Sequence, residues 1–324
     1  SATIKSVQKP KKVVLSGSIS LDRIMNFGGS YADLIKPDKI HVLSLSVLID
    51  NLTHSRGGVA TNIAYNLALL GDHPIVLGSV GSDALDYIGD LKKHGVNTDH
   101  IHQSNLPTAT FTVLTDKNNN QVGGFYPGAM SDAKDLSLKT WSNTNTLAVV
   151  SANDPSLMAR LVTEAREYSL ELIYDPSQQV SNCTGDHLKA GVMAARVLMV
   201  NDYELSVLCT KSGMTEEEVK KLVPIVITTL GKDGSELSDK YLSKPIHVPA
   251  ISGIKPVDPT GAGDAYRGGF IYGYSRGWDL ETCMQLGSVM ASFTVELAGT
   301  QTHHPDKHEI NTRYKNTFNK NLNL

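Results

Sequence analysis

The sequence predicts an α/β fold, in which a doubly wound, mostly parallel sheet flanked by helices carries a small β-sheet lid. From residue 147 onward, short apolar runs alternate with helical segments, a pattern typical of a parallel sheet covered on both faces. Two β-rich stretches, 24–56 and 106–127, interrupt the alternation, and we expect them to pair beside the main sheet. With 324 residues, 40% apolar and 19% charged, the chain can bury a sizeable core.

The first third of the chain predicts two buried strands and two helices. Residues 12–15 and 75–80 are short apolar runs bounded by serine and glycine, as expected for core strands. A helix is predicted to end at Gly71 and a second one, beginning at residue 86, to end at Gly95. A glycine directly after the last periodic residue is a common helix terminator.

The two β-rich stretches predict exposed strands. In residues 42–49, Leu and Val alternate with Ser, which indicates a half-exposed strand. Residues 108–115 are rich in β-forming side chains, and the turn sequence Asp-Lys-Asn-Asn-Asn at 116–120 is followed by a returning strand at 121–126.

The second half of the chain predicts repeated strand–helix units. The expected strands lie at 147–151, 172–175, 197–201 and 225–229, separated by helices around 156–168, 185–195 and 203–222. Clusters of polar residues follow the predicted strands, at 16–22, 151–154, 175–179, 201–204 and 228–234. Ligands of open α/β sheets bind beyond the carboxyl ends of the strands, so these clusters predict one shared site.

The sequence Asp-Pro-Thr-Gly-Ala-Gly-Asp-Ala-Tyr-Arg-Gly-Gly-Phe at 258–270 predicts a turn followed by a helix capped by Asp258 or Thr260. Glycines at 261, 263, 268, 269 and 273 each cost about 1 kcal/mol within a helix, which indicates a close approach of the backbone, most simply to an anion at the helix N-terminus. Asp264 would then be a base for a group that attacks a phosphate. The alternative is a glycine-softened turn before a buried helix.

Composition and missing motifs exclude several classes of protein. The net charge of −3 gives no basic surface for nucleic acid, and no apolar run approaches the roughly 20 residues of a membrane span. Cys183, Cys209 and Cys283 form no Cys-x-x-Cys pair, which fits a cytoplasmic protein without disulfides or zinc. The absence of a Gly-x-Gly-x-x-Gly after the first strand weakens a Rossmann oxidoreductase as an alternative.

Residues 258–270 resemble the C-terminal signature of the ribokinase (PfkB) family of carbohydrate and nucleoside kinases. Three other motifs of this family stand in the expected order, at 56–62, 201–204 and 229–234. A closer resemblance, to the bacterial type of adenosine kinase, rests on stretches that have no role in the general sugar-kinase pattern: 16–19, 44–46, 125–131, 152–155, 175–179, 201–204 and 299–301. The resemblance therefore favours a nucleoside over a free sugar.

The resemblance implies a role for each part of the motif that transfers the phosphoryl group. Asp264 would deprotonate the acceptor hydroxyl, and the backbone N–H groups of Gly261, Ala262 and Gly263 would bind the transferring phosphoryl. On the ATP side the implied residues are Thr229, Gly231 and Gly234. Asn201 and Glu204 would organise Mg²⁺ through water, although both also fit a simple helix cap.

The resemblance also implies a nucleoside site. The ribose would be held by Ser18, Asp22, Gly58 and Asn62. The base would lie against Phe111 and Phe125, with Gln178 and Gln179 near its edge. Helix or turn caps remain the alternative for Asp22 and Asn62, and core packing for the two phenylalanines. Val47 stands where bacterial adenosine kinases tend to carry an aromatic residue, which leaves wider purine tolerance open.

The resulting hypothesis is an ATP- and Mg²⁺-dependent adenosine kinase of purine salvage that yields AMP, with K⁺ as a further expected ion. Residues 1–23, 57–105 and 128–324 would form the large catalytic domain, and 24–56 and 106–127 a β-lid through which a homodimer forms. The alternatives are a broader nucleoside kinase, a ribokinase-like sugar kinase and a non-catalytic nucleoside-binding protein.

Overall fold

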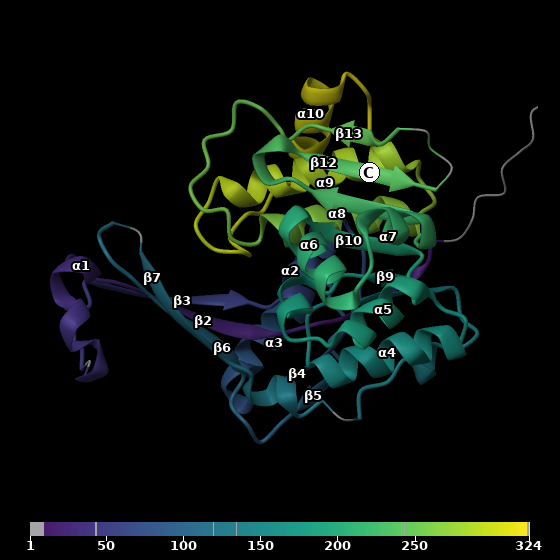
Figure 1. Ribbon diagram of the computed structural model, residues 1–324. Coiled ribbons are helices and arrows are strands. Elements are labelled where there is room, and N and C mark those ends of the chain that lie inside the picture. The colour runs from purple at the N-terminus through teal and green to yellow at the C-terminus, as the bar shows by residue number, and fades with distance from the viewer. Residues whose placement is uncertain are drawn as a thin grey trace, which may run out of the picture.

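The structure is a computed structural model that describes residues 10–324 except Leu43, Asn119, Lys134, Tyr241, Ser243 and Asn323. A nine-stranded sheet forms its centre, in the order β13-β12-β11-β10-β9-β8-β1-β4-β5 (Figure 1). Neighbouring strands pair in parallel, except that β12 pairs antiparallel with both β11 and β13. Its strands are β1 (Lys12–Ser16), β4 (Ile75–Val80), β5 (Ile101–Gln103), β8 (Thr146–Val150), β9 (Glu171–Tyr174), β10 (Val197–Asn201), β11 (Ile225–Thr229), β12 (Ser235–Asp239) and β13 (Ile246–Val248). The predicted α/β architecture is confirmed.

Helices cover both faces of this sheet, and each layer encloses its own apolar core. One layer consists of α2 (Val59–Leu69), α3 (Leu85–Lys93), α8 (Ala262–Ser275), α9 (Leu280–Val295) and α10 (Lys307–Phe318). The other consists of α4 (Pro155–Glu167), α5 (Gly185–Ala194), α6 (Asp202–Ser212) and α7 (Glu216–Leu222). Strand β1 shows why: Val13 and Leu15 enter the first core while Val14 enters the second, because successive side chains of a strand point to opposite faces.

Close helix packing explains three of the five glycines in and around the 258–270 motif. A Cβ on Gly268 would lie 2.6 Å from the Asn66 side chain of α2, and one on Gly269 would lie 2.7 Å from the Leu286 carbonyl of α9. A Cβ on Gly273 would lie 2.9 Å from Cys283. The expectation that these glycines serve an anion is therefore wrong for positions 268, 269 and 273, where they let α8 approach its neighbours.

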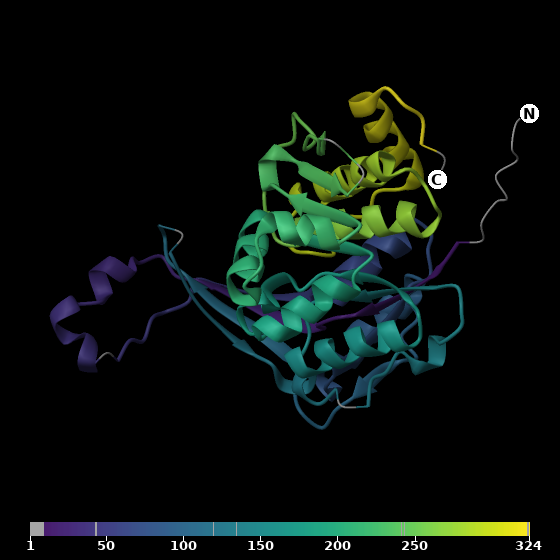
Figure 2. The same ribbon diagram turned by 45° about the vertical axis from the view of Figure 1, so that its right-hand side comes forward.

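A separate four-stranded sheet, in the order β3-β2-β6-β7, extends away from the body of the molecule (Figures 1 and 2). Its strands are β2 (Ser20–Asn26), β3 (Asn51–Gly57), β6 (Ala109–Thr115) and β7 (Gln121–Tyr126). The predicted pairing of residues 108–115 with 121–126 is confirmed as the antiparallel β6–β7 hairpin. The small sheet thus begins at Ser20 and includes Gly57, a wider span than the predicted lid, whose status as a separate domain stays a prediction.

The strand predicted at 42–49 is wrong. Leu43 lies outside the described residues, a 3₁₀ helix, η1, covers Pro37–Val42, and residues 44–49 have no regular structure. The partner of β2 is instead the polar segment β3, which is exposed along most of its length. The short helix α1 (Tyr31–Leu34) and η1 lie at the far end of the small sheet. Within the part of the chain that the structure describes, no helix has the length and apolarity needed to span a bilayer.

Candidate active site

Two neighbouring hollows lie at the carboxyl ends of the parallel strands. One has a volume of about 620 Å³ and lies among β10, β11, the 250–259 loop and α9. The other, of about 450 Å³, lies between the start of α8 and the 177–181 turn. Asn201, Tyr203 and Gly263 line both, so the two hollows meet at the first turn of α8. We name them the nucleotide-side hollow and the acceptor-side hollow.

The first turn of α8 is shaped by Gly261, which is the N-cap residue with a φ of 80°. This left-handed conformation is open to glycine and strained for other residues. The expected side-chain cap is absent, because Asp258 instead accepts hydrogen bonds from the N–H groups of Thr260 (2.9 Å) and Gly299 (2.9 Å). The N–H of Ala262 donates to the Pro259 carbonyl at 3.2 Å. Asp258 therefore closes the loop that presents the N-terminus of α8 to both hollows.

Asp264 lies three residues after Gly261, in the first turn of α8, and lines the acceptor-side hollow. Its Oδ2 accepts a 2.8 Å hydrogen bond from Nδ2 of Asn62, which comes from the first turn of α2. Burial raises the pKa of Asp264 to about 7, against the opposing effects of Arg267 and of the Asn62 hydrogen bond. A carboxylate with this pKa can accept a proton at neutral pH and release it again.

Arg267, which the sequence interpretation missed, connects Asp264 to two other carboxylates. Its Nη2 donates to Oδ1 of Asp175 at 2.7 Å, and its Nε lies 2.6 Å from Oδ2 of the same residue. The same Nη2 lies 3.7 Å from Oε2 of Glu204, and Nη1 lies 3.9 Å from Oδ1 of Asp264. The Arg267 side chain is only 8% exposed, and the surrounding carboxylates keep its pKa above the ordinary value.

The predicted sugar-side residues converge where β1 passes into β2. The Oγ of Ser18 accepts from the N–H of Val59 at 3.1 Å. Gly58, with a φ of 103°, sits so close to this crossing that a Cβ would lie 2.5 Å from the Ser18 carbonyl. Asp22 lies within β2, not in the loop after β1, and burial raises its pKa despite a hydrogen bond from Ser20.

Strand register places Asp22 and the two predicted base-stacking residues in one row. Asp22 pairs with Phe111 of β6, and Phe111 pairs with Phe125 of β7; residues paired across strands share a face of the sheet. The rings are 39% and 49% exposed, so core packing does not account for them. A Cβ on Gly123 would lie 3.1 Å from the Phe111 ring, and the glycine leaves room for that ring.

The two predicted glutamines differ. Gln178 lines the acceptor-side hollow. The amide of Gln179 is already engaged, since it donates to the Asn153 carbonyl (2.8 Å) and accepts from Asn182 (2.8 Å). Of the pair, only Gln178 is available for a ligand in the structure as it stands, and a role for Gln179 remains a prediction.

The predicted ATP-side residues Thr229, Gly231 and Gly234 all line the nucleotide-side hollow. Asn201 and Glu204 form a capping box at the start of α6, with reciprocal hydrogen bonds of 2.8 and 2.7 Å. The two residues therefore do cap α6. A role in organising Mg²⁺ remains a prediction, because both residues also line the acceptor-side hollow.

The charges around Arg267 fit a divalent cation bound indirectly. Asp175, Glu204 and Asp264 face one guanidinium, so negative charge is in excess when all three are ionised. Burial raises the pKa of Glu204, which Arg267 opposes. Within the described ranges, no three His, Cys, Asp or Glu side chains are arranged to hold a metal. A Mg²⁺ ion here would be held mainly by water and phosphate oxygens.

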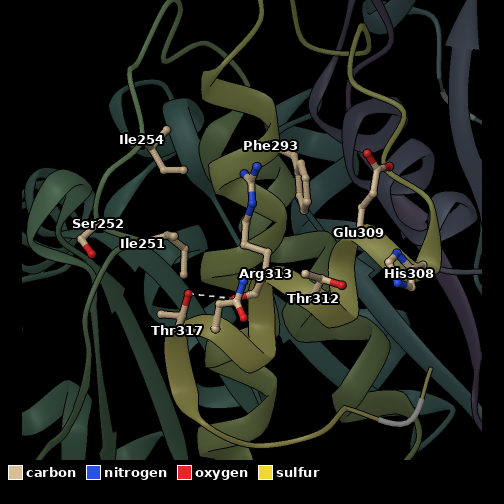
Figure 3. Close-up of a pocket in the computed structure, with 10 residues that line it drawn as sticks. Ile251, Ser252, Ile254, Phe293, His308, Glu309, Thr312, Arg313 and Thr317 are labelled. Atoms are coloured by element: carbon tan, nitrogen blue, oxygen red, sulfur yellow. Dashed lines mark hydrogen bonds between the residues drawn. The ribbon is translucent and has the colours of Figure 1, made fainter.

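A third hollow, of about 590 Å³, lies outside this arrangement, between α10 and the 251–254 loop (Figure 3). Ile251 and Ile254 separate it from the nucleotide-side hollow and line both. Arg313 lines this hollow. Its guanidinium carbon lies 3.6 Å from the centroid of the Phe293 ring, and its Nη1 lies 2.8 Å from Oε2 of Glu296. Nη1 of Arg313 also donates to Oγ of Ser292 at 2.9 Å, and Ser292 lines the nucleotide-side hollow.

Comparisons with known proteins match the chain over nearly its whole length. Residues 21–307 match the pfkB family carbohydrate kinase model. The chain is 32% identical to a nucleoside kinase of Methanothermobacter thermautotrophicus over 286 residues, covering 87% of this chain and 91% of that protein. The nucleoside kinase of Burkholderia thailandensis in complex with inosine has a TM-score of 0.85 at 30% identity, covering 96% of this chain and 100% of that chain. The Methanocaldococcus jannaschii nucleoside kinase, an archaeal member of the ribokinase family, has a TM-score of 0.83 at 28% identity, covering 95% and 99%.

Proposed function

The chain belongs to the pfkB family of carbohydrate kinases, and from this premise we propose that it transfers the γ-phosphoryl group of ATP to the 5′-hydroxyl of a nucleoside. It is an ATP-dependent phosphotransferase with a hydroxyl acceptor, as its nucleoside kinase relatives are. The observation that carries the proposal is the meeting of the two hollows at Gly263, with Asp264 lining the acceptor side.

In the proposed reaction, Asp264 takes the proton of the attacking hydroxyl as the hydroxyl oxygen bonds to the γ-phosphorus of ATP. The bond between that phosphorus and the β–γ bridging oxygen breaks, and ADP leaves. Its pKa of about 7 matches a general base that operates at neutral pH. The N–H groups at the start of α8 and the helix dipole would stabilise the charge on the transferring phosphoryl. Bound Mg²⁺ would neutralise charge on the phosphate oxygens, with Asn201 and Glu204 holding its water ligands.

We propose a purine nucleoside as the acceptor, with adenosine as the predicted preferred substrate. Support comes from the row of Asp22, Phe111 and Phe125, which offers a carboxylate to a sugar and two rings to a base. The Burkholderia thailandensis enzyme has been solved in complex with inosine and in complex with ADP-inosine. This supports a purine nucleoside as the acceptor and makes inosine the first competitor of adenosine. A K⁺ requirement remains a prediction from the family resemblance.

We also propose that the small sheet is a lid and that two copies of the chain associate through it. Large apolar side chains are exposed on this part of the molecule, at Leu34, Ile40, Val42, Leu48, Leu52 and Val122, and exposed apolar patches often mark interfaces. Leu48 is 87% exposed. Light scattering should detect a dimer that Leu48→Asp weakens; a monomeric parent chain would refute the proposal.

A substrate panel tests the function directly. ATP-coupled turnover would be measured with adenosine, inosine, guanosine, cytidine and ribose, each as kcat/KM. A purine nucleoside should be the best acceptor, with ribose lower because it lacks a base to contact Phe111 and Phe125. Ribose as the best substrate would replace the proposal with a sugar kinase. Inosine or guanosine ahead of adenosine would reject only the adenosine preference.

A further inference from the structure

The segment Gly299–Thr300–Gln301, which follows α9, contacts the loop before α8, the N-cap residue of α8 and the first turn of α2. The N–H of Gly299 donates to Asp258, which closes the loop before α8. The hydroxyl of Thr300 donates to the Arg56 carbonyl at 2.8 Å, and its methyl group lies 2.9 Å from the place of a Cβ on Gly261. These contacts fix the position of the next residue, Gln301.

The Gln301 side chain lies behind Asn62. Its Nε2 donates one hydrogen to Oδ1 of Asn62 at 2.8 Å and the other to the hydroxyl oxygen of Tyr87 at 2.6 Å. Asn62 in turn donates from Nδ2 to Asp264 at 2.8 Å. A continuous chain of hydrogen bonds therefore runs from α3 through Gln301 and Asn62 to Asp264.

The ends of this chain determine the direction of every hydrogen bond in it. The hydroxyl of Tyr87 donates to the Gly57 carbonyl at 3.0 Å, and a carbonyl can only accept. The Tyr87 oxygen is then an acceptor, so Gln301 must present its NH₂ group to Tyr87 and Asn62. Asn62 consequently shows its oxygen to Gln301 and its NH₂ group to Asp264. Burial raises the pKa of the Tyr87 hydroxyl, which keeps this donor protonated.

We propose that Gln301 is a positioning residue that orients the Asn62 amide so that its NH₂ group, and not its oxygen, faces Asp264. This inference rests on the proposed function of Asp264 as the base. Without Gln301, the Asn62 amide can rotate and bring its oxygen toward the carboxylate, which would repel the ionised form. The same segment fixes Asp258 and packs on Gly261, so it also couples the base to the phosphoryl-binding turn.

The first variants are Gln301→Met, which keeps the volume but removes both donors, and Gln301→Glu, whose ionised carboxylate can only accept. We expect either change to lower kcat about tenfold to a hundredfold, the scale of a displacement of about 1 Å in a catalytic group. The acid limb of the kcat/KM profile should also move upward by about one pH unit, because a hydrogen bond that favours the ionised carboxylate is lost. A purely structural defect would not move this limb.

The matched control is Thr302→Val. Its hydroxyl is exposed and donates to the nearby carbonyls of Ala298 and Gly299. Thr302→Val should leave kcat and the pH profile unchanged. A loss equal to that of Gln301→Met would show that the segment responds to any substitution and would overturn the specific role of Gln301.

A double-mutant cycle provides the decisive test. If Gln301 acts through Asn62, Gln301→Met should cost little kcat in an Asn62→Ala background, because residues of one hydrogen-bonded chain are not additive. If kcat of the double variant fell by the product of the two single-variant factors, the proposal would be rejected.

Failure of the proposed function would look different. A parent enzyme that lacks ATP-dependent turnover with every nucleoside, or retains it after Asp264→Asn, would remove the premise. An active, Asp264-dependent enzyme with an additive cycle would reject only the role of Gln301.

Discussion

The surroundings of Asp264, the proposed base, and the aromatic row of the small sheet are built in opposite ways. Asp264 has an exposed side-chain fraction of 13%, and its neighbours Asp175, Glu204 and Arg267 are each below 10%. Each of these neighbours has partners within the protein. The groups of the proposed phosphoryl transfer are therefore in place before any ligand binds.

The aromatic row has few such partners. Phe111 and Phe125 are 39% and 49% exposed, on a sheet that extends from the body of the molecule (Figure 2). Neither ring is among the residues that line the two hollows.

The difference indicates that the charged part of the site is preorganised, whereas the proposed recognition of the base would need a movement of the small sheet or the arrival of the base itself. Preorganised charges stabilise a transition state without reorganisation cost, and lids commonly close over a bound substrate. Substitutions in the buried part should therefore change kcat, and those on the sheet should mainly change KM.

The largest effect is expected for Asp264→Asn. Loss of a general base typically lowers kcat by about 10²- to 10⁴-fold, while nucleoside binding, measured by calorimetry, should persist. Since burial raises the pKa of Asp264 to about 7, kcat/KM of the parent enzyme should fall as pH drops below about 7. Asp86→Asn, on the exposed side of α3, is the matched control. Near-normal turnover of Asp264→Asn would remove the base from the mechanism.

Thermal unfolding of the same variant gives an independent check. Between the ordinary carboxyl pKa of 3.8 and about 7, folded Asp264 keeps a proton that the unfolded chain has released. The free energy of unfolding contributed by this group therefore decreases as pH rises through that range. Asp264→Asn should gain stability relative to the parent at pH 8 and lose that advantage at pH 4. An advantage that grows toward acid pH would contradict the raised pKa.

A smaller effect is expected for Arg267→Met. Arg267 opposes the rise in the pKa of Asp264, so its removal should move the acid limb of kcat/KM to higher pH and lower turnover at pH 7. Arg267→Lys keeps the charge but loses the two-point contact with Asp175. Its turnover at pH 7 should lie between those of the parent and of Arg267→Met. Breaking a buried ion pair can cost about 3–5 kcal/mol.

The double variant Arg267→Met with Asp175→Asn guards against a failure to fold, because it removes both charges of the pair. It should be more stable than Arg267→Met alone. Its acid limb should still differ from that of the parent, because Glu204 continues to raise the pKa of Asp264. An unchanged pH profile in both variants would limit Arg267 to a structural role.

The sequence predicted the local parts of the site better than its long-range contacts. The 258–264 turn and the polar residues after the strands follow from neighbouring residues alone. The turn meets the polar residues that follow β9, β10 and β11 at one edge of the sheet. Arg267 and Asp175 are 92 positions apart, so no local pattern connects them. Likewise Gln301 reaches Asn62 across 239 positions.

The wrong prediction of a strand at 42–49, and the failure to predict β3, have a different physical cause. Alternation at 42–49 predicts a strand only if the apolar face is buried, but Leu45, which belongs to that face, is exposed. Strand β3, at the edge of the small sheet, is held by backbone pairing to β2 and buries little on either face. Its polar sequence therefore carries no period-2 signal.

The smallest expected effect is for Phe125→Leu, which keeps an apolar side chain but removes the ring. An aromatic stacking contact contributes about 0.5–1.5 kcal/mol beyond its buried area, so kcat/KM for a purine nucleoside should fall about threefold to tenfold, mostly through KM. Tyr126→Leu is the matched control, since it also removes an exposed ring from β7, but at a position of opposite parity and hence on the other face of the sheet. Ribose turnover should not respond to either change. If Phe125→Leu lowered kcat without raising KM, the sheet would take part in the chemical step, and the separation between a preorganised base and a recruited recognition surface would fail.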